Sequence, residues 1–214
     1  MRFEKIDEKV TQGGHIAARY RMFAEGAPGN KVFALVSWPM DKALSTDPRD
    51  IYVNGQGLLM LHRPKPEQEL SLKAGDDEFD ILPVTDSAEP VRYLLSTRFG
   101  PLSIPGTLVP HPVVSEDHGC RLEVRIAQPN AKAVLIIADR FPAKAKIPLL
   151  LESDDVTDNE MLTTNADGHA VIAVFPYLPG KTHGMLKADA EGPNCLPNVV
   201  LPWGAEPHAA PKTP

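Results

Sequence analysis

The chain has 214 residues, of which 43% are hydrophobic and 23% charged, the composition of an ordinary globular protein rather than a fibrous or wholly disordered one. The formal net charge is −6, and Lys and Arg are scattered along the chain, so we expect neither a nucleic-acid groove nor binding to an anionic membrane surface. No apolar stretch reaches the roughly 18 residues of a transmembrane helix, so no membrane span is expected.

Short strands are the elements that the first half predicts. The 22 prolines leave little room for long helices, because each removes a backbone donor and clashes with the preceding turn. Apolar or alternating runs are separated by clusters of Gly, Pro, Asp and Asn, which favour turns. The expected strands are 15–23, 31–38, 50–54, 58–62, 78–82 and 91–97. The charged segment 1–10 is expected to form a short helix or a loose arm.

A change of composition at 99–112 divides the chain. This stretch holds four prolines and two glycines and predicts a linker or a stiff crossover strand. We place the domain boundary here, with one β-sandwich domain at 1–105, a second at 106–205 and a disordered tail at 206–214.

Seven further strands follow, with turn signals between them. They are expected at 121–127, 132–138, 147–152, 160–164, 169–175, 184–188 and 198–203. This rhythm is typical of a β-sandwich.

The two cysteines, Cys120 and Cys195, stand just before the first and the last of these seven strands. First and last strands of a sandwich often lie close together, which favours a disulfide between them. Two buried free thiols are the alternative. No CxxC motif is present, so a zinc ribbon or thioredoxin-type site is not supported.

One segment of the second half resembles known bacterial modules. Residues 163–169 (TTNADGH) precede an alternating strand that ends in FPYLPG at 175–180. This order of strand, Asp-Gly turn, strand and Pro-Gly resembles immunoglobulin-like and transthyretin-like bacterial modules. Their commonest version places a Tyr-x-Leu strand directly after the Pro-Gly, whereas here KTHG intervenes at 181–184.

The second half as a whole resembles a group of uncharacterised secreted bacterial proteins. The shared stretches are CRLEV at 120–124, RFP at 140–142, NC at 194–195 and PWG at 202–204, together with AEPVRY at 88–93. The resemblance implies an all-β chain of two immunoglobulin-like β-sandwich domains in tandem, and it points to secretion. No catalytic residue comes with it. The first ten residues lack the apolar core of a signal peptide, which leaves a cytoplasmic protein or a mature chain without its signal.

Few residues suggest chemistry. The sequence has no G-x-S-x-G, H-E-x-x-H or phosphate-binding glycine loop. His111 and His118 are interpreted as solvated loop histidines rather than metal ligands. The acidic residues Asp154, Asp155, Asp158 and Glu160 are the one candidate cofactor site, for Ca²⁺, with a solvated acidic turn as the default. The candidate sugar platforms are the aromatic residues Trp38, Tyr52, Tyr93 and Tyr177, with core packing as the commoner role.

A non-enzymatic extracellular or periplasmic module for binding or structural assembly is therefore favoured. The alternative is an enzyme or a carbohydrate-binding accessory domain, with a site at the cleft between the two domains and polar loops at 41–50 and 111–118. In a third hypothesis an edge strand such as 91–97 pairs with a second copy or a partner protein.

Overall fold

The computed structural model describes residues 1–10, 16–40, 42–62, 78–83, 85 and 87–204. Their regular structure is β-strand apart from one 3-10 turn, η1 (Pro129–Ala131), so the expected all-β fold is confirmed. No helix in this part is long and apolar enough to cross a membrane. The expected tail at 206–214 and residue 41 of the expected polar loop lie outside the described residues.

The chain divides into two compact units, and each has its own core. The N-terminal unit comprises Met1–Asp86 and Pro90–Pro110, and the C-terminal unit comprises Ser87–Glu89 and His111–Pro214. The expected boundary at residue 105 falls inside a strand, because Ser103–Leu108 pairs with Val91–Thr97 along its length. Pro105 is accepted there because the strand lies at the edge of its sheet, where a missing backbone donor breaks no ladder.

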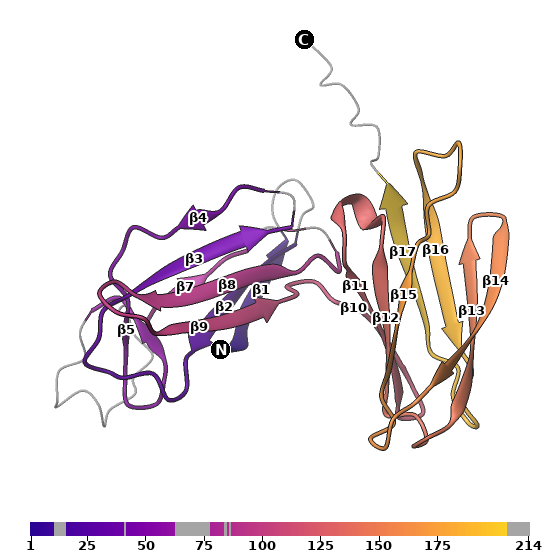
Figure 1. The fold of residues 1–214 in the computed structure, drawn as a ribbon, viewed down its shortest axis with the longest axis horizontal. Helices are drawn as coiled ribbons and strands as arrows, with labels where there is room; N and C mark the ends of the chain where they lie inside the picture. Colours follow the sequence, from indigo (N-terminus) through magenta and orange to yellow (C-terminus); the bar gives the residue numbers. More distant parts are fainter. Residues whose placement is uncertain (11–15, 41, 63–77, 84, 86, 205–214) are drawn as a thin grey trace, which may run out of the picture. The chain divides into compact units, whose positions relative to one another are not determined.

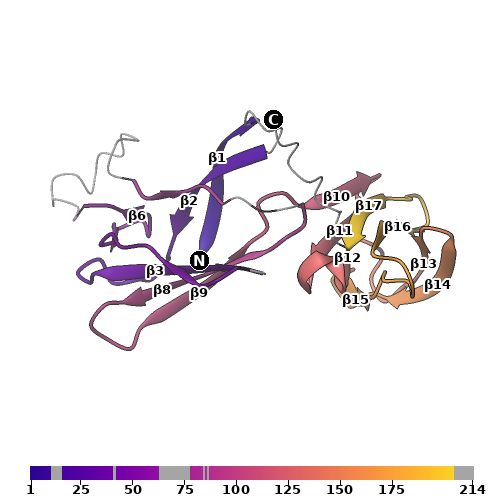
Figure 2. The same cartoon turned by 90° about the horizontal axis from the view of Figure 1, so that it is seen from above.

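The N-terminal unit contains nine of the described strands. Their bounds are β1 (Arg2–Val10), β2 (Ile16–Phe23), β3 (Phe33–Pro39), β4 (Ser45–Thr46), β5 (Tyr52–Val53), β6 (Leu59–Met60), β7 (Asp80–Ile81), β8 (Val91–Thr97) and β9 (Ser103–Leu108). Two sheets, ordered β1-β2-β7 and β4-β3-β8-β9, form separate layers, and β5 pairs with β6 (Figure 2). Large fully buried side chains, among them Phe33, Phe79 and Leu95, fill the core.

Arg2–Val10 form strand β1, so the expectation of a short helix or loose arm at 1–10 is wrong. β1 pairs antiparallel with β2 from Arg2 opposite Phe23 to Val10 opposite Ile16, with a bulge between Lys5 and Asp7. The ring of Phe3 packs on Tyr93, with ring centroids 5.4 Å apart. This apolar contact, 90 positions away along the chain, holds a segment whose own sequence is dominated by charge.

Strand β8 lies inside its sheet, so the proposal that 91–97 is an edge strand open to another chain is wrong. β8 pairs with β3 on one side and with β9 on the other. Its backbone donors and acceptors are therefore used within the unit, and none is left for β-augmentation.

The C-terminal unit contains all seven strands expected in the second half and one more before them. They are β10 (Val113–Asp117), β11 (Cys120–Ile126), β12 (Val134–Asp139), β13 (Lys146–Ser153), β14 (Val156–Thr163), β15 (Ala170–Val174), β16 (His183–Ala190) and β17 (Asn198–Gly204). The sheets β10-β11-β12-β15 and β14-β13-β16-β17 face each other (Figures 1 and 2). Without β10, the strands β11-β12-β15 correspond to A-B-E, and β14-β13-β16-β17 correspond to C′-C-F-G, in the letters used for immunoglobulin-like sandwiches.

Alternation along the strands of the C-terminal unit directs one set of side chains into a shared core. On β13, Ile147, Leu149 and Leu151 point inward and are buried, whereas the residues between them are on the other side. Leu186 on β16 and Leu201 on β17 meet them in the same cluster. Each such buried side chain contributes about 2 kcal/mol relative to exposure, so the inward set dominates the stability of the unit.

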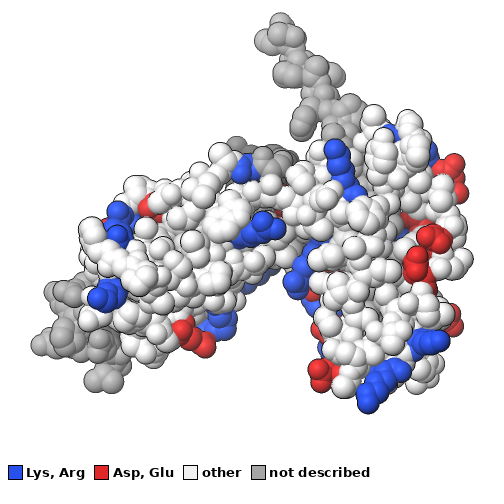
Figure 3. All heavy atoms as spheres, viewed as in Figure 1, with Lys and Arg blue, Asp and Glu red and all other residues white. Residues whose placement is uncertain are grey.

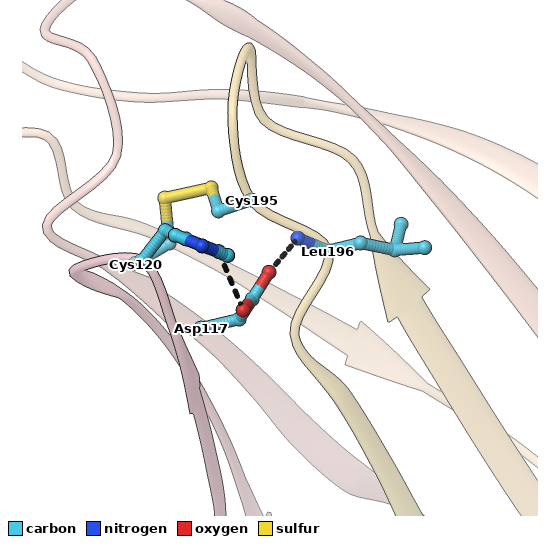
Figure 4. Close-up of a disulfide and its surroundings, with 5 residues drawn as sticks. Asp117, Cys120, Cys195 and Leu196 are labelled. Atoms are coloured by element: carbon cyan, nitrogen blue, oxygen red, sulfur yellow. Dashed lines mark hydrogen bonds and ion pairs between the residues drawn. A yellow bond between two sulfur atoms is a disulfide. The ribbon is translucent and has the colours of Figure 1, made fainter.

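A disulfide links Cys120 and Cys195 and confirms the predicted bridge (Figure 4). Cys120 begins β11 in one sheet, and Cys195 precedes β17 in the other, with a Cα–Cα distance of 6.2 Å. Beside it, the carboxylate of Asp117 accepts a 2.7 Å hydrogen bond from the backbone N–H of Leu196. This hydrogen bond lowers the pKa of Asp117 below its usual value. The bridge and the hydrogen bond together tie the β10–β11 turn to the loop before β17.

We expect removal of the disulfide to destabilise the C-terminal unit. A loop of 75 residues corresponds to about 4 kcal/mol in the chain-entropy account. The variant carrying Cys120→Ala and Cys195→Ala should therefore unfold at a clearly lower urea concentration than the oxidised wild type. A reducing agent should lower the wild-type midpoint and leave that of the variant unchanged. Equal midpoints for variant and oxidised wild type would contradict the assignment.

The turn at Gly168 should be the least tolerant turn glycine of this unit. Gly168 has φ +75°, and a Cβ added there would lie 2.0 Å from the carbonyl oxygen of Phe141. Gly180, at φ +83°, has nothing within 4 Å of such a Cβ. Gly180→Ala should therefore lose only about 1 kcal/mol of stability, the cost of a left-handed conformation for a residue with a Cβ. Gly168→Ala should lose considerably more. Thermal unfolding of the two variants side by side checks this order, which equal losses would refute.

Candidate functional site

The outer face of the sheet β14-β13-β16-β17 carries apolar side chains that the core does not use. The most exposed are Met161 (55%), Met185 (46%) and Val200 (46%), together with Leu196 (55%) in the loop before β17. The strand register places Met161 opposite Pro148 and Met185 opposite Pro202. These residues alternate with the buried ones, so the same strands that build the core also present an apolar surface to solvent.

A groove of about 610 Å³ crosses part of this outer face. Pro148, Leu150, Met161 and Leu196 give it apolar walls. Polar residues at the same groove are Asn159, Glu160, Lys187, Asp189 and Glu191. The groove therefore has an apolar lining within a charged rim.

The rim of the groove is negatively charged. Lys187 is already engaged: its Nζ lies 2.7 Å from Asp189 Oδ2 and 3.7 Å from Glu152 Oε2. The hydrogen bond to Asp189 raises the pKa of Lys187. Glu191 has no ion-pair partner within the described part of the chain, so it leaves negative charge at the groove. Glu160 alternates with Met161 along β14, so its side chain is on the other side of the strand. Figure 3 shows acidic side chains recurring along the edge of this unit at β14.

A second hollow, the end cavity, has a volume of about 290 Å³ and lies at one end of the sandwich. Its lining residues are Asn130, Lys132, Tyr177, Lys181, Thr182, Trp203 and Gly204. Trp203 lies near the end of β17 and is 2% exposed, whereas Tyr177 follows β15 and is 53% exposed. Their rings meet edge to face, with centroids 6.0 Å apart.

The loops around the end cavity are held by specific contacts. The buried hydroxyl of Ser153 donates a 2.6 Å hydrogen bond to the carbonyl of Pro176 and so fixes the residue before Tyr177. A Cβ at Gly184 would lie 2.5 Å from both Trp203 Cζ2 and Asp154 Oδ2, so the absence of a side chain there makes room for the indole. Asn130 adopts φ 56°, a left-handed conformation that Asn tolerates.

An ion cluster of Asp154, Asp155 and Lys181 adjoins this cavity. The Nζ of Lys181 donates to Asp155 Oδ1 at 2.6 Å and to Asp154 Oδ2 at 3.1 Å, and Asp154 Oδ1 accepts from the backbone N–H of Met185 at 2.9 Å. The bond from Met185 and then that from Lys181 lower the pKa of Asp154, and the bond from Lys181 lowers that of Asp155. Both carboxylates are therefore held in the charged form, and both already accept hydrogen bonds within the cluster.

The predicted calcium ligands do not gather into a site. Asp154 and Asp155 contact the ammonium of Lys181, whereas Asp158 and Glu160 lie further along β14. No cluster of three or more His, Cys, Asp or Glu side chains suited to a metal occurs among the residues that the structure describes. The pattern of carboxylates in the sequence did not show the lysine, 26 residues further on, that binds two of them.

The four candidate aromatic residues do not form one platform. Trp38 on β3 and Tyr52 on β5 are half-buried in the N-terminal unit. Tyr93 on β8 is 4% exposed, and burial raises its pKa well above the usual tyrosine value. Only Tyr177 lies in the C-terminal unit, where its partner is Trp203. Trp203 is not among the four candidates from the sequence, although the alternation along β17 is a signal that places it inward, with Val199, Leu201 and Trp203 all buried.

No protein family matches the chain through its family model, and no curated protein matches it. Among solved structures, a two-domain fibronectin type-III segment of chicken tenascin is similar at 10% sequence identity, with a TM-score of 0.26. The match covers 95% of this chain and 98% of that segment. The fold described above rests on strand order and register, and this weak likeness adds nothing to them.

Replacing Lys181 by Met should raise the pKa of both neighbouring carboxylates, and that of Asp155 more. Asp155 loses the hydrogen bond from Lys181, which lowers its pKa most, whereas Asp154 keeps the hydrogen bond from the backbone N–H of Met185. A ¹³C NMR titration of the aspartate carboxyls measures both values, with Lys146→Met, an exposed lysine on β13, as the control. An unchanged Asp155, or a larger rise at Asp154, would show that Lys181 does not hold the cluster.

Proposed function

We propose that this protein is a non-enzymatic binding module that works outside the cytosol, in the extracellular space or the periplasm, and engages a protein partner. The observation that carries the proposal is the apolar outer face of the sheet β14-β13-β16-β17. The disulfide supports the location, since such bonds persist mainly in oxidising compartments.

The outer face has the composition of an interaction surface. Exposed apolar side chains that stand alone are normal. On the outer face they gather in two groups, Met161 opposite Pro148 near one end and Met185 opposite Pro202, with Val200, near the other. A partner segment that spans both groups would bury them together. Met161 and Met185 contribute flexible, polarisable side chains, and Met is enriched in protein interfaces. By contrast, on the other sheet Glu123 forms ion pairs with Arg121 at 2.6 Å and Arg125 at 2.5 Å, so charge on that surface is paired internally.

Charge complementarity indicates the chemistry of the partner. Glu191 leaves negative charge at the rim of an apolar groove. A partner segment that inserts an apolar side chain and carries Lys or Arg beside it would satisfy both features. Complementary charge of this kind selects among partners and accelerates encounter more than it adds affinity.

A random peptide library displayed on phage and panned on the full-length protein tests this proposal. The selected peptides should combine an apolar anchor with flanking Lys or Arg. Met161→Lys and Val200→Lys should each weaken a selected peptide at least tenfold, because each places a cation in the apolar contact and repels the basic flanks.

Val171→Lys is the matched control. Val171 is 49% exposed, close to the 46% of Val200, but lies on β15 in the opposite sheet. Its replacement should leave the affinity unchanged in biolayer interferometry. Peptides that bind the Met161→Lys and Val200→Lys variants as tightly as the wild type would refute the outer face as the binding surface.

A further inference from the structure

We propose that the end cavity of the C-terminal unit is a binding site for an acidic sugar, a hexuronate residue. The cavity is separate from the groove on the outer face. Its volume of about 290 Å³ lies at the lower limit of small-molecule sites, about 300 Å³. A ligand of one sugar ring with its substituents is therefore the appropriate size.

The aromatic wall provides the surface for the apolar face of a sugar ring. Tyr177 is 53% exposed, so much of its ring is available to a ligand. Trp203 stands behind it, 2% exposed and edge to face with it, and keeps the tyrosine ring from collapsing into the sandwich. Ser153 fixes the backbone at Pro176, which limits where the Tyr177 ring can lie before a ligand arrives. A pre-positioned ring loses little entropy on binding.

Polar groups from separate elements surround this wall. Asn130 in η1 offers an amide with both donors and an acceptor, and Lys181 an ammonium, whereas the Thr182 hydroxyl already contacts His183 Nδ1 at 3.2 Å. Asp154 and Asp155 hold that ammonium from behind. An apolar ring face with donors and acceptors around its edge matches a ligand that presents C–H groups on one side and several hydroxyls at its rim.

Lys132 is the group at the cavity that would pair with an anionic ligand. Lys132 lines the cavity and forms no ion pair with any residue in the described part of the chain. Lys181 lies on the same cavity, with its charge compensated by the two aspartates. The cluster of Lys181 with the two aspartates carries a net charge of −1, so Lys132 is the cation at the cavity that is free to pair with the carboxylate of a uronate. A neutral sugar would satisfy the aromatic wall but not this charge.

The indole of Trp203 is an independent sign that the site is incomplete. Its Nε1–H is buried and has no hydrogen-bond partner among the described residues. An unsatisfied buried donor is costly, and native structures contain few of them. A ligand oxygen that reached this end of the cavity after a small shift of the Tyr177 ring would supply the missing acceptor.

Indole N–H signals in ¹⁵N NMR test the proposal directly, because the chain contains only two tryptophans. In the full-length Trp38→Phe variant, the remaining signal belongs to Trp203. Titration with D-glucuronate should shift it saturably, with a dissociation constant of about 1 mM for a ligand of this size. D-glucose should bind at least fivefold more weakly, and added salt should weaken glucuronate but not glucose.

Variants separate the parts of the site. Tyr177→Ala should abolish saturable binding of both sugars, and Lys132→Gln should bring glucuronate down to the affinity of glucose. The controls are Lys146→Gln, an exposed lysine on β13, and Met161→Lys on the outer face. Neither should change the titration, so failure of this site and failure of the proposed protein-binding face are distinguishable.

Three results would overturn the proposal. The first is an indole signal that does not move with glucuronate at 50-fold the expected dissociation constant. The second is equal binding of benzoate, which would make the cavity a general site for carboxylates. The third is full retention of glucuronate binding in Tyr177→Ala.

Discussion

The two-residue alternation along β13, β16 and β17 is the constraint on which the C-terminal unit depends. Leu149, Leu186 and Leu201 point inward and close the sandwich against the opposite sheet. Because successive side chains point to opposite faces, their neighbours necessarily form the outer face. Core and candidate binding surface are therefore two sides of the same strands, and a shift of register by one residue would exchange them.

The contacts between the sheets and their loops turn this sandwich into a scaffold for sites. The disulfide joins the two sheets at one end, where Asp117 also binds the loop before β17. Elsewhere the chain uses single polar contacts for the same purpose, as Ser153 does for the loop that carries Tyr177. Rigid strands with loops fixed at their ends are the usual way in which sandwiches present binding residues.

Much of this fold could be predicted from the sequence, because alternating runs and turn residues are local signals. All seven strands expected in the second half are present, and so is the disulfide. The failures have non-local causes. The strand β1 is not evident from its charged sequence because Phe3 packs on Tyr93, far along the chain. The prolines in and around β9 leave a linker and a crossover strand as alternatives, unless the strand is known to lie at the edge of its sheet.

The candidate sites were harder to predict than the fold, for the same reason. Lys181 reaches back to Asp154 and Asp155, which resembled calcium ligands only while their partner was unknown. Trp203 meets Tyr177 only after β17 has been placed against the β15–β16 loop. The outer face, by contrast, is implicit in the alternation along the strands. Apolar residues in a sequence are nevertheless assigned to the core by default, until the strand register shows which face each one lies on.

Oxidation footprinting of the methionines in the presence and absence of a selected peptide tests the two-sided use of these strands most directly. We expect bound peptide to slow oxidation of Met161 and Met185, while Met22, which is 0% exposed in the core of the N-terminal unit, stays unreactive in both states. Unchanged oxidation of Met161 and Met185 in the complex would contradict the account.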